Sequence, residues 1–298
     1  MKRYVSIDIG GTAIKYGILN EKGEILSRSE MQTEAYKGGT FILAKAIGIV
    51  EEYQRSAAVD GICISTAGMV DTKSGMIFHS APLIPHYSGT RFKETMERKF
   101  RVPCEVENDV NCAGLAESVS GAAQGADPSL ILTIGTGIGG CIMIGGKVFH
   151  GFGNSACEVG YMHLLGSDFQ TLGAASILTR KVAEWKNEPA ASWNGYRIFE
   201  EAKRGDELCI RAIDEMTDVL GLGIANICYV INPEIVVLGG GIMAQEGYLK
   251  DRIQDAVAKY LIPGIASHTK IAFARHKNDA GLTGAFYHFM QCQRYGER

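Results

Sequence analysis

One supersecondary unit occurs twice in this sequence, and the repetition constrains the fold more than any other feature. Residues 4–19 (YVSIDIGGTAIKYGIL) and 130–147 (LILTIGTGIGGCIMIGGK) each read as an apolar strand, a turn rich in glycine and threonine, and a second apolar strand. Glycines in such turns are expected to adopt positive φ angles and to let backbone N–H groups approach an anion. They are Gly10, Gly11, Gly135, Gly137, Gly139 and Gly140. Both turns are therefore predicted to hold phosphates, although a single copy suits a ligand-free β-hairpin equally well.

Neither turn matches the two common nucleotide-binding patterns. The P-loop pattern G-x-x-x-x-G-K-[ST] does not occur in the sequence. Residues 135–140 (GTGIGG) have a rhythm close to the dinucleotide fingerprint, but the strand-like stretch 141–146 (CIMIGG) follows where that fingerprint requires a helix. The hairpins therefore argue against both a P-loop protein and a Rossmann fold.

Composition narrows the function classes further. The 298 residues are 46% hydrophobic and 21% charged, which is typical of a globular chain long enough for two lobes. A net charge of -3 without a Lys/Arg-rich run argues against a nucleic-acid surface. Glycines break the apolar runs before the roughly 20 residues that a membrane helix needs, and Asp8 interrupts the signal-like start. We expect a cytoplasmic protein with no membrane or nucleic-acid partner.

Cysteine and histidine usage predicts no metal cluster. Eight cysteines are scattered through apolar segments without a C-x-x-C pair, which favours buried thiols in a reducing compartment. The histidines considered as ligands stand far apart or alone, and each is expected to be an ordinary surface or core histidine. They are His86, His163, His268, His276 and His288.

Two further features suit a nucleotide. Asp8 stands at the end of the first apolar strand, where a carboxylate beside the glycine turn would hold a hydrated magnesium ion. Residues 233–249 (PEIVVLGGGIMAQEGYL) read as a buried strand, a triple-glycine turn and a helix. Bare backbone in that turn would accommodate a flat adenine ring.

The stretch 102–117 (VPCEVENDVNCAGLAE) changes from a period of two to the spacing of a helical face at Asn108 and Asp109. The pair therefore lies at a strand-to-helix junction. One interpretation is that Asn108 or Asp109 only caps the helix, since both residue types are favoured there. The alternative is that one residue caps the helix while the other carries a chemical role.

Six segments in order resemble the ROK sugar kinases, within the superfamily of hexokinases, heat-shock ATPases and actin. They are DIGGTAIK, STAGMVD, VENDVN, LTIGTGIGG, EVGYM and VVLGGGI, and the resemblance covers essentially the whole chain. It implies an α/β fold of two lobes with duplicated ribonuclease-H-like topology, with Mg²⁺, ATP and a sugar in the cleft between them. The implied nucleotide-binding residues are Asp8, Gly10, Gly11, Thr12, Lys15, Thr133, Gly135, Thr136, Gly137, Gly139, Gly240 and Gly241.

The same resemblance assigns roles at the sugar. Asp109 matches the general base that accepts a proton from the sugar hydroxyl, and Asn108 the residue that orients the acceptor. Glu158 matches the glutamate that grips sugar hydroxyls, and Gly68 a backbone position that lines the sugar pocket. A solvated loop carboxylate remains the alternative interpretation of Glu158.

The chain departs from the family pattern at the positions that bind zinc in most relatives. Tyr161 replaces the usual histidine of E-x-G-H, and the C-x-C-G-x-x-G-C cluster is absent from residues 164–178 (LLGSDFQTLGAASIL). Because every ligand is missing together, we predict no zinc. Tyr161 is expected to reshape the pocket around the anomeric end of the sugar. Whether Gln170 replaces a sugar-contacting glutamate is left open.

EVGYM together with residues 276–289 is similar to the β-glucoside kinase branch, which phosphorylates the 6-hydroxyl of the non-reducing glucose in cellobiose and aryl β-glucosides. Glucokinase and N-acetylmannosamine kinase remain alternatives, because small pocket differences shift specificity by only about 1–3 kcal/mol. A non-enzymatic sugar sensor is less favoured. Related sugar-responsive repressors carry a helix-turn-helix domain ahead of the first strand, where this chain has only MKRY, so a DNA-binding repressor is not expected. The resemblance suggests a homodimer.

The apolar periodicity predicts the element order. Strands are expected at 3–9, 13–19, 24–28, 60–65, 103–107, 234–238 and 269–274, and helices at 39–56, 90–100, 173–187, 195–203, 206–231 and 247–261. A last helix within 278–292 is expected to cross back to the first lobe, as in relatives. The small lobe is therefore predicted to comprise residues 1–117 plus about 283–298, and the large lobe residues 118–282.

Overall fold

The computed structural model describes residues 2–296. The chain divides into two compact units. The first comprises Met1–Val119, Lys147–Ala156 and Asn278–Arg298, and the second comprises Ser120–Gly146 and Cys157–Lys277. The sequence placed residues 147–156 in the second unit, but they contact the first, where His150 bonds to Glu107. The last two residues of the predicted small lobe lie outside the described residues.

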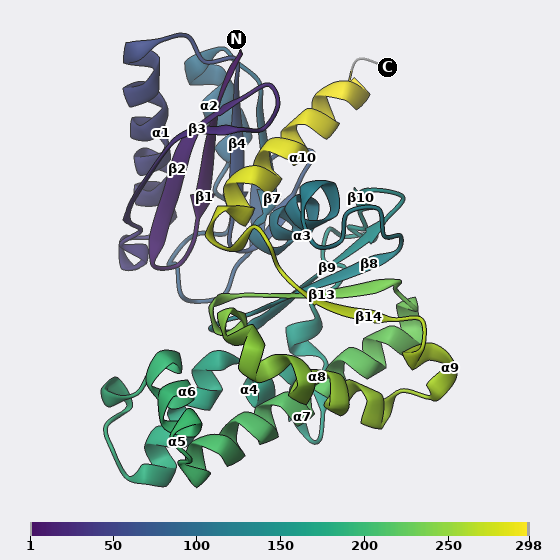
Figure 1. The fold of residues 1–298 in the computed structure, drawn as a ribbon. Helices are drawn as coiled ribbons and strands as arrows, with labels where there is room; N and C mark the ends of the chain where they lie inside the picture. The colour runs from purple at the N-terminus through teal and green to yellow at the C-terminus, as the bar shows by residue number, and fades with distance from the viewer. Residues whose placement is uncertain (1, 297–298) are drawn as a thin grey trace. The chain divides into compact units, whose positions relative to one another are not determined.

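The first unit is built on a five-stranded sheet (Figure 1). Its order is β3 (Ile25–Gln32), β2 (Ala13–Asn20), β1 (Arg3–Ile9), β4 (Gly61–Thr66) and β7 (Cys104–Asn108). β1 pairs antiparallel with β2 and parallel with β4, which in turn pairs parallel with β7. Because parallel strands end at the same edge, Asp8, Ser65 and Asn108 are brought to one edge of the sheet.

Helices cover both faces of this sheet. α1 (Gly39–Ser56) and α2 (Phe92–Phe100) pack in one apolar cluster with the strands, and Ile62 and Ile64 of β4 point into it. The intervening Cys63 points to the opposite face, where it packs with α10 (Ala280–Gly296). This alternation is the reason why β4 is apolar on consecutive residues.

This unit contains further elements, most of them short. They are the β5–β6 hairpin (Met69–Asp71 and Met76–His79), β10 (Lys147–Val148), η1 (Ala35–Lys37) and α3 (Asp109–Ser120). η5 (Lys277–Asp279) begins in the second unit and ends in the first.

The second unit repeats the arrangement. The strands of its sheet that lie in this unit are, in order, β9 (Ile138–Ile144), β8 (Ser129–Ile134), β13 (Ile235–Gly239) and β14 (Lys270–Phe273). β8 pairs antiparallel with β9 and parallel with β13, as β1 does with β2 and β4. The same topology therefore occurs twice, which confirms the predicted α/β class and duplication.

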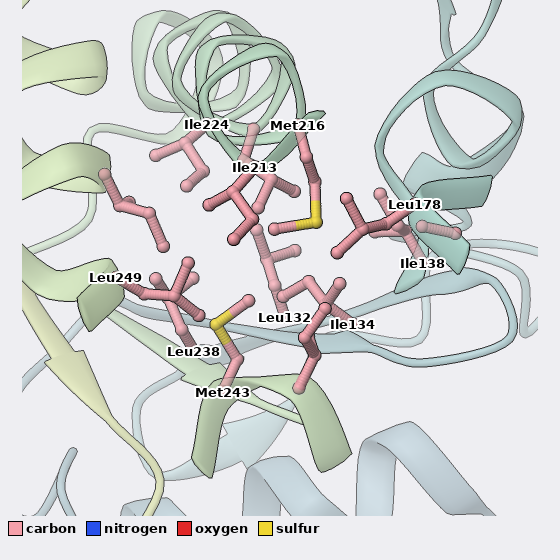
Figure 2. Packing of buried hydrophobic residues seen from close by; sticks show 14 of the residues in the cluster. Leu132, Ile134, Ile138, Leu178, Ile213, Met216, Ile224, Leu238, Met243 and Leu249 are labelled. Carbon is pink, nitrogen blue, oxygen red and sulfur yellow. The ribbon is translucent and has the colours of Figure 1, made fainter. Parts of the chain in front are cut away.

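Long helices form the core of the second unit on one face of its sheet. Figure 2 shows Leu132 and Leu238 of the strands facing Ile213 and Ile224 of α7 (Glu207–Ile231), with Leu249 of α8 (Glu246–Tyr260) beside them. The other elements are α4 (Phe169–Gly173), α5 (Ala175–Lys186), α6 (Gly195–Lys203), α9 (Pro263–Ala266), β11 (His163–Leu164), β12 (Ser167–Asp168), η2 (Val159–Tyr161), η3 (Ala190–Ser192) and η4 (Gly241–Gln245).

Local signals fix the ends of α7. Asp206 caps its start by accepting a hydrogen bond from the Cys209 backbone N–H at 2.9 Å. Asn232 ends it in the left-handed region at φ 50, and Pro233 follows. In residues 2–296, no helix is both long enough and apolar enough to cross a membrane.

The predicted helices and strands are present with small shifts at their ends. α10 extends to Gly296 where the prediction ended at residue 292. β3 extends to Gln32 where the prediction ended at residue 28. Most of its side chains are exposed because it is an edge strand, so its polar sequence carries no apolar alternation. The short hairpin β5–β6 and helix α4 were not predicted, since neither is long enough to show a period.

Candidate active site

The Asn108–Asp109 turn joins β7 to α3. Asn108 is the cap, since its Oδ1 accepts from the backbone N–H groups of Val110 at 2.9 Å and Asn111 at 3.1 Å. Its Nδ2 donates to Asp109 Oδ1 and to the Gly68 carbonyl, both at 3.0 Å. The side chain of Asn108 is thereby fully hydrogen-bonded within the protein. A sugar hydroxyl would have to exchange with one of these bonds.

Asp109 is the first residue of α3 and is partly exposed. Its Oδ1 also accepts from the Val110 backbone N–H at 2.9 Å. A carboxylate at a helix N-terminus is stabilised in its charged form by the helix dipole. Asn108 and Asp109 therefore share the turn as the junction interpretation requires, with the capping amide on Asn108 and a held carboxylate on Asp109.

Gly68 belongs to the same cluster. Its carbonyl accepts from Asn108, and its φ of 95 lies in the region that favours glycine. A Cβ at this position would lie 2.9 Å from the carbonyl oxygen of His79. Gly68 thus has both a conformational and a packing reason to be glycine, and it links the β4–β5 connection to the turn.

Asp8 lies at the end of β1 beside the first glycine turn. Its Oδ1 accepts from the Ser65 hydroxyl at 2.7 Å, and Lys15 is its register partner on β2. Burial raises the pKa of Asp8, while the Ser65 bond and the Lys15 charge act in the opposite direction. A Cβ on Gly281 would lie 2.2 Å from Asp8 Cγ, so glycine there makes room for the carboxylate. An oxygen donor that burial makes costly to ionise gains from a nearby cation, and Asp8 therefore fits Mg²⁺.

The first glycine turn is a tight hairpin. The Gly10 N–H donates to the Ala13 carbonyl at 3.1 Å, and Thr12 is exposed. A Cβ on Gly11 would meet nothing within 4 Å, so the surface above this glycine is open. Lys15 donates through Nζ to the Asn278 carbonyl at 3.3 Å. The predicted phosphate residues of this turn are thus close in the chain and accessible.

The second glycine turn joins β8 to β9. The Gly135 N–H donates to the Gly137 carbonyl at 2.9 Å, and the Gly135 carbonyl accepts from the N–H of Ala175 at 3.0 Å. The Thr136 carbonyl accepts from the Ser176 hydroxyl at 2.6 Å. The start of α5 therefore anchors this turn. The predicted Thr133 lies at the end of β8, and Gly139 lies opposite it in the register of β9.

The prediction of positive φ angles in the two turns is wrong. Of the residues described, Gly10, Gly11, Gly135, Gly137, Gly139 and Gly140 all lie outside the set of positive-φ glycines. Close packing is instead the reason why residue 140 is glycine. A Cβ on Gly140 would lie 2.6 Å from Cys157 Sγ and 2.8 Å from the Cys157 carbonyl oxygen.

The triple-glycine turn does contain a positive φ angle. Gly240 has a φ of 97, and a Cβ there would lie 2.2 Å from the Ile134 carbonyl oxygen. A Cβ on Gly241 would meet nothing within 4 Å. This turn therefore presses its backbone against the end of β8 and leaves an open surface at the next residue.

Glu158 and Tyr161 flank a 3-10 turn in the second unit. Glu158 is exposed and precedes η2, and the Tyr161 side chain is 50% exposed at its end. Gln170 lies under this region, since its Oε1 is 2.7 Å from a Cβ built on Gly137 and 3.0 Å from one built on Gly160. Gln170 thus packs between the second glycine turn and η2. The sequence alone did not predict this position of Gln170.

His288 is a buried core histidine, as expected, although other ligand types lie beside it. Its imidazole, Cys292 and Glu105 bring ligand atoms within 4.8 Å of one another. The sequence hid this group because Glu105 lies on β7 and the other two lie on α10. The Glu105 carboxylate already binds the Lys93 ammonium at 2.7 Å and the Gln293 amide at 3.1 Å. A cation there would have to displace a charged lysine, so these residues do not form a ready metal site.

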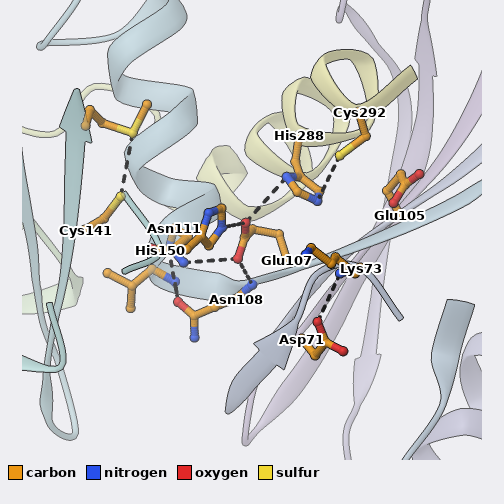
Figure 3. A network of polar contacts seen from close by, with 12 residues as sticks. Asp71, Lys73, Glu105, Glu107, Asn108, Asn111, Cys141, His150, His288 and Cys292 are labelled. Atoms are coloured by element: carbon orange, nitrogen blue, oxygen red, sulfur yellow. Dashed lines mark hydrogen bonds and ion pairs between the residues drawn. The ribbon is translucent and has the colours of Figure 1, made fainter. Parts of the chain in front are cut away.

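Sequence reasoning also missed Glu107 and His150. Glu107 precedes Asn108 and is almost completely buried, and its Oε2 lies 2.6 Å from His150 Nε2 (Figure 3). The only sequence signal for Glu107 was its place in the segment VENDVN. Strand periodicity gives no reason to expect a charged residue at a buried position.

Known proteins resemble this chain along most of its length. The ROK family profile matches residues 4–291. A β-glucoside kinase from Listeria innocua serovar 6a is 32% identical over 297 residues, covering 97% of this chain and 98% of that protein.

Solved structures give the same result for the fold. A Listeria monocytogenes protein provisionally assigned as an N-acetylmannosamine kinase has a TM-score of 0.88 at 32% identity, covering 98% of this chain and 99% of that one. A ROK family glucokinase from Streptomyces griseus, solved with glucose and AMPPNP, has a TM-score of 0.83 at 27% identity, covering 95% and 97%. The predicted architecture is therefore confirmed along nearly the whole chain.

Proposed function

This chain belongs to the ROK family, and we propose that it is an ATP-dependent kinase that phosphorylates the 6-hydroxyl of a glucose unit in β-glucosides such as cellobiose. The observation that carries the proposal is the Asn108–Asp109 turn. It holds a partly exposed carboxylate at a helix N-terminus, in a chain that matches sugar kinases over its length.

In the proposed reaction, the sugar oxygen attacks the γ-phosphorus of ATP while the bond to the β,γ-bridging oxygen breaks and ADP leaves. The hydroxyl proton passes to the Asp109 carboxylate, which acts as general base. The hydrogen bond from Asn108 Nδ2 to Asp109 Oδ1 restricts the rotation of that carboxylate. The chain therefore supplies a base whose orientation is set before the substrate arrives.

The phosphates are assigned to the two glycine turns. Exposed N–H groups around Gly11 and Thr136 would donate to phosphate oxygens, and Lys15 would add a positive charge. Asp8 would hold Mg²⁺, through water or directly, and the ion would neutralise charge on the phosphate oxygens. Adenine would lie against the backbone of Gly240 and Gly241.

The sugar class rests on the residues that depart from the family pattern. Tyr161 is half exposed beside Glu158, where relatives place a histidine. Glu158 would grip the hydroxyls of the glucose unit while Tyr161 would border the anomeric substituent. Glucokinase and N-acetylmannosamine kinase activities are the alternatives, and both occur among the names of similar proteins.

A coupled assay for ADP release tests this proposal. The purified protein is supplied with Mg-ATP and, in turn, glucose, N-acetylmannosamine, cellobiose, gentiobiose and salicin, with Asp109→Asn as the matched inactive control. We expect the highest kcat/KM for cellobiose, gentiobiose or salicin. Rapid turnover of glucose with none of cellobiose would exclude the β-glucoside assignment and keep the kinase. Binding of a sugar without ADP release from any acceptor would favour a sugar sensor instead.

A further inference from the structure

Glu107 is a buried carboxylate directly before the proposed catalytic turn, and it is 1% exposed. Its Oε1 accepts from the Asn108 backbone N–H at 2.7 Å and from the Asn111 side-chain amide at 3.0 Å. Its Oε2 accepts from His150 Nε2 at 2.6 Å, and Figure 3 shows the three contacts converging on one side chain. One carboxylate thus joins the start of α3 to the segment 147–156.

This carboxylate keeps its charge in spite of burial. Burial alone raises the pKa of Glu107, but the His150 hydrogen bond, the charges of His288 and His150 and the Asn111 bond outweigh it, so the pKa lies below its usual value. Burial lowers the pKa of His150, but the bond and charge of Glu107 outweigh that effect and the pKa is raised. Both shifts therefore favour the charged forms, and the contact favours an ion pair.

Four groups face Glu107 from the elements packed around it. His150 comes from segment 147–156, His288 from α10 at 3.5 Å, and Asn111 and Cys112 from α3. Burial lowers the pKa of His288 below its usual value despite the pull of Glu107. Burial thus disfavours a charge on His288, whereas the contact with Glu107 favours a charge on His150.

We propose that Glu107 and His150 form a positioning pair that fixes the Asn108–Asp109 turn for phosphoryl transfer. The Asn108 N–H has Glu107 as its acceptor, and the same Asn108 holds Asp109 through its side chain. A shift of Glu107 would therefore move the carboxylate of Asp109, and a misplacement of about 1 Å costs on the order of 10²-fold in rate. The inference rests on the proposed function, since phosphoryl transfer is the reaction in which the turn is proposed to take part.

Two substitutions of His150 separate positioning from packing. His150→Ala removes the donor and leaves Glu107 without its charged partner, so we expect kcat to fall about 10²-fold while KM for ATP stays within a factor of about three. His150→Gln keeps a neutral N–H donor, and we expect it to restore part of that kcat, to about the level that wild type keeps once His150 has lost its proton. His268→Ala, at an exposed histidine of the second unit, is the control and should match wild type.

The pH dependence of kcat separates positioning from a purely structural role, because a purely structural role would leave it unchanged. In wild type, kcat should decline as pH rises and His150 loses its proton, because a neutral donor holds Glu107 less strongly. His150→Gln does not titrate, so this alkaline decline should be absent. Wild-type kcat and an unchanged pH profile in both variants, even with a lower melting temperature, would overturn the proposal.

Amide hydrogen exchange tests the pair without relying on catalysis. In His150→Ala, the amides of residues 108–112 should exchange faster, while those of α7 in the second unit stay unchanged. If wild type phosphorylates no sugar, the proposed function is refuted, and this exchange still decides the pair. Unchanged exchange at residues 108–112 refutes the pair and leaves the kinase proposal standing.

Discussion

Compared strand by strand, the two sheets of this protein follow one order but end in different chemistry. β2-β1-β4-β7 in the first unit corresponds to β9-β8-β13-β14 in the second. Asp8 stands two residues before Gly10 at the end of β1, and Thr133 stands two residues before Gly135 at the end of β8. Asp109 follows β7, whereas Ala274 follows β14.

The two copies of the repeated topology therefore carry different functional groups. The first unit places carboxylates at the strand ends, and each is held by a neighbour, as Ser65 holds Asp8 and Asn108 holds Asp109. The second places a hydroxyl and backbone N–H groups at the matching turn, which the start of α5 anchors. We infer that the first unit supplies acid–base and metal chemistry, and that the second supplies neutral donors to phosphate.

Replacing the base should give the largest effect in this comparison. Asp109→Asn keeps the size of the side chain but removes the proton acceptor, so kcat should fall by about 10²- to 10⁴-fold. The melting temperature should change little, because Asn is also accepted at a helix N-terminus. Steady-state kinetics and thermal unfolding of the same preparation provide the measurement. Near-wild-type turnover would contradict the assignment of acid–base chemistry to the first unit.

Asp8 and Thr133 occupy matching positions in the two units. Substituting each of them tests directly whether the units have different roles. Asp8→Asn should lower kcat about 10²-fold and raise the Mg²⁺ concentration required for half-maximal activity, since it removes a charged oxygen ligand. Thr133→Val should cost about tenfold or less and leave the Mg²⁺ requirement unchanged. Kinetics over a Mg²⁺ titration decide between them. Equal Mg²⁺ requirements in both variants would contradict this difference in roles.

Stability should distinguish the glycines of the two turns. A Cβ on Gly140 would clash with the Cys157 carbonyl oxygen at 2.8 Å, whereas one on Gly11 would meet open space. Gly140→Ala should therefore destabilise the protein by about 1–3 kcal/mol, and Gly11→Ala by less than about 0.5 kcal/mol. Gly11→Ala should instead raise KM for ATP. Thermal unfolding that ranks the two variants in the opposite order would show that the packing argument is wrong.

The smallest expected effect is a pH dependence confined to the first unit. The folded-state pKa of His150 is raised above its usual 6.5, so its stabilising contribution is complete below pH 6.5 and is lost as pH rises through the raised value. Glu107 stays ionised in this window, because its pKa is lowered. Melting temperatures measured upward from pH 6 should fall slightly more for wild type than for His150→Gln. Parallel curves would show that the ion pair adds nothing to stability.

Local periodicity was enough to predict most of the fold. α1 and α6 begin and end at the predicted residues because their buried side chains recur at helical spacing. The edge strand β3 was predicted too short because it buries little and carries no alternation. Tight turns were located correctly, but the reason given for their glycines was conformational, whereas Gly140 is required by packing against Cys157.

The site was predictable only where one short segment contains it. Asn108 and Asp109 are adjacent, and a change of period marks their junction. His150 reaches Glu107 across 43 residues, and Gln170 packs against Gly137 from another element. No local pattern encodes such contacts, because they depend on how loops return to the sheet.

Identification of the product tests the central claim most directly. Wild-type protein is incubated with Mg-ATP and cellobiose, and the products are examined by ³¹P and ¹³C NMR beside an Asp109→Asn sample. The account predicts one ADP for each sugar phosphate, with the phosphate on the 6-carbon of the non-reducing glucose, and no product from the variant. Equal product from Asp109→Asn, or no sugar phosphate from wild type with any sugar of the panel, would contradict it.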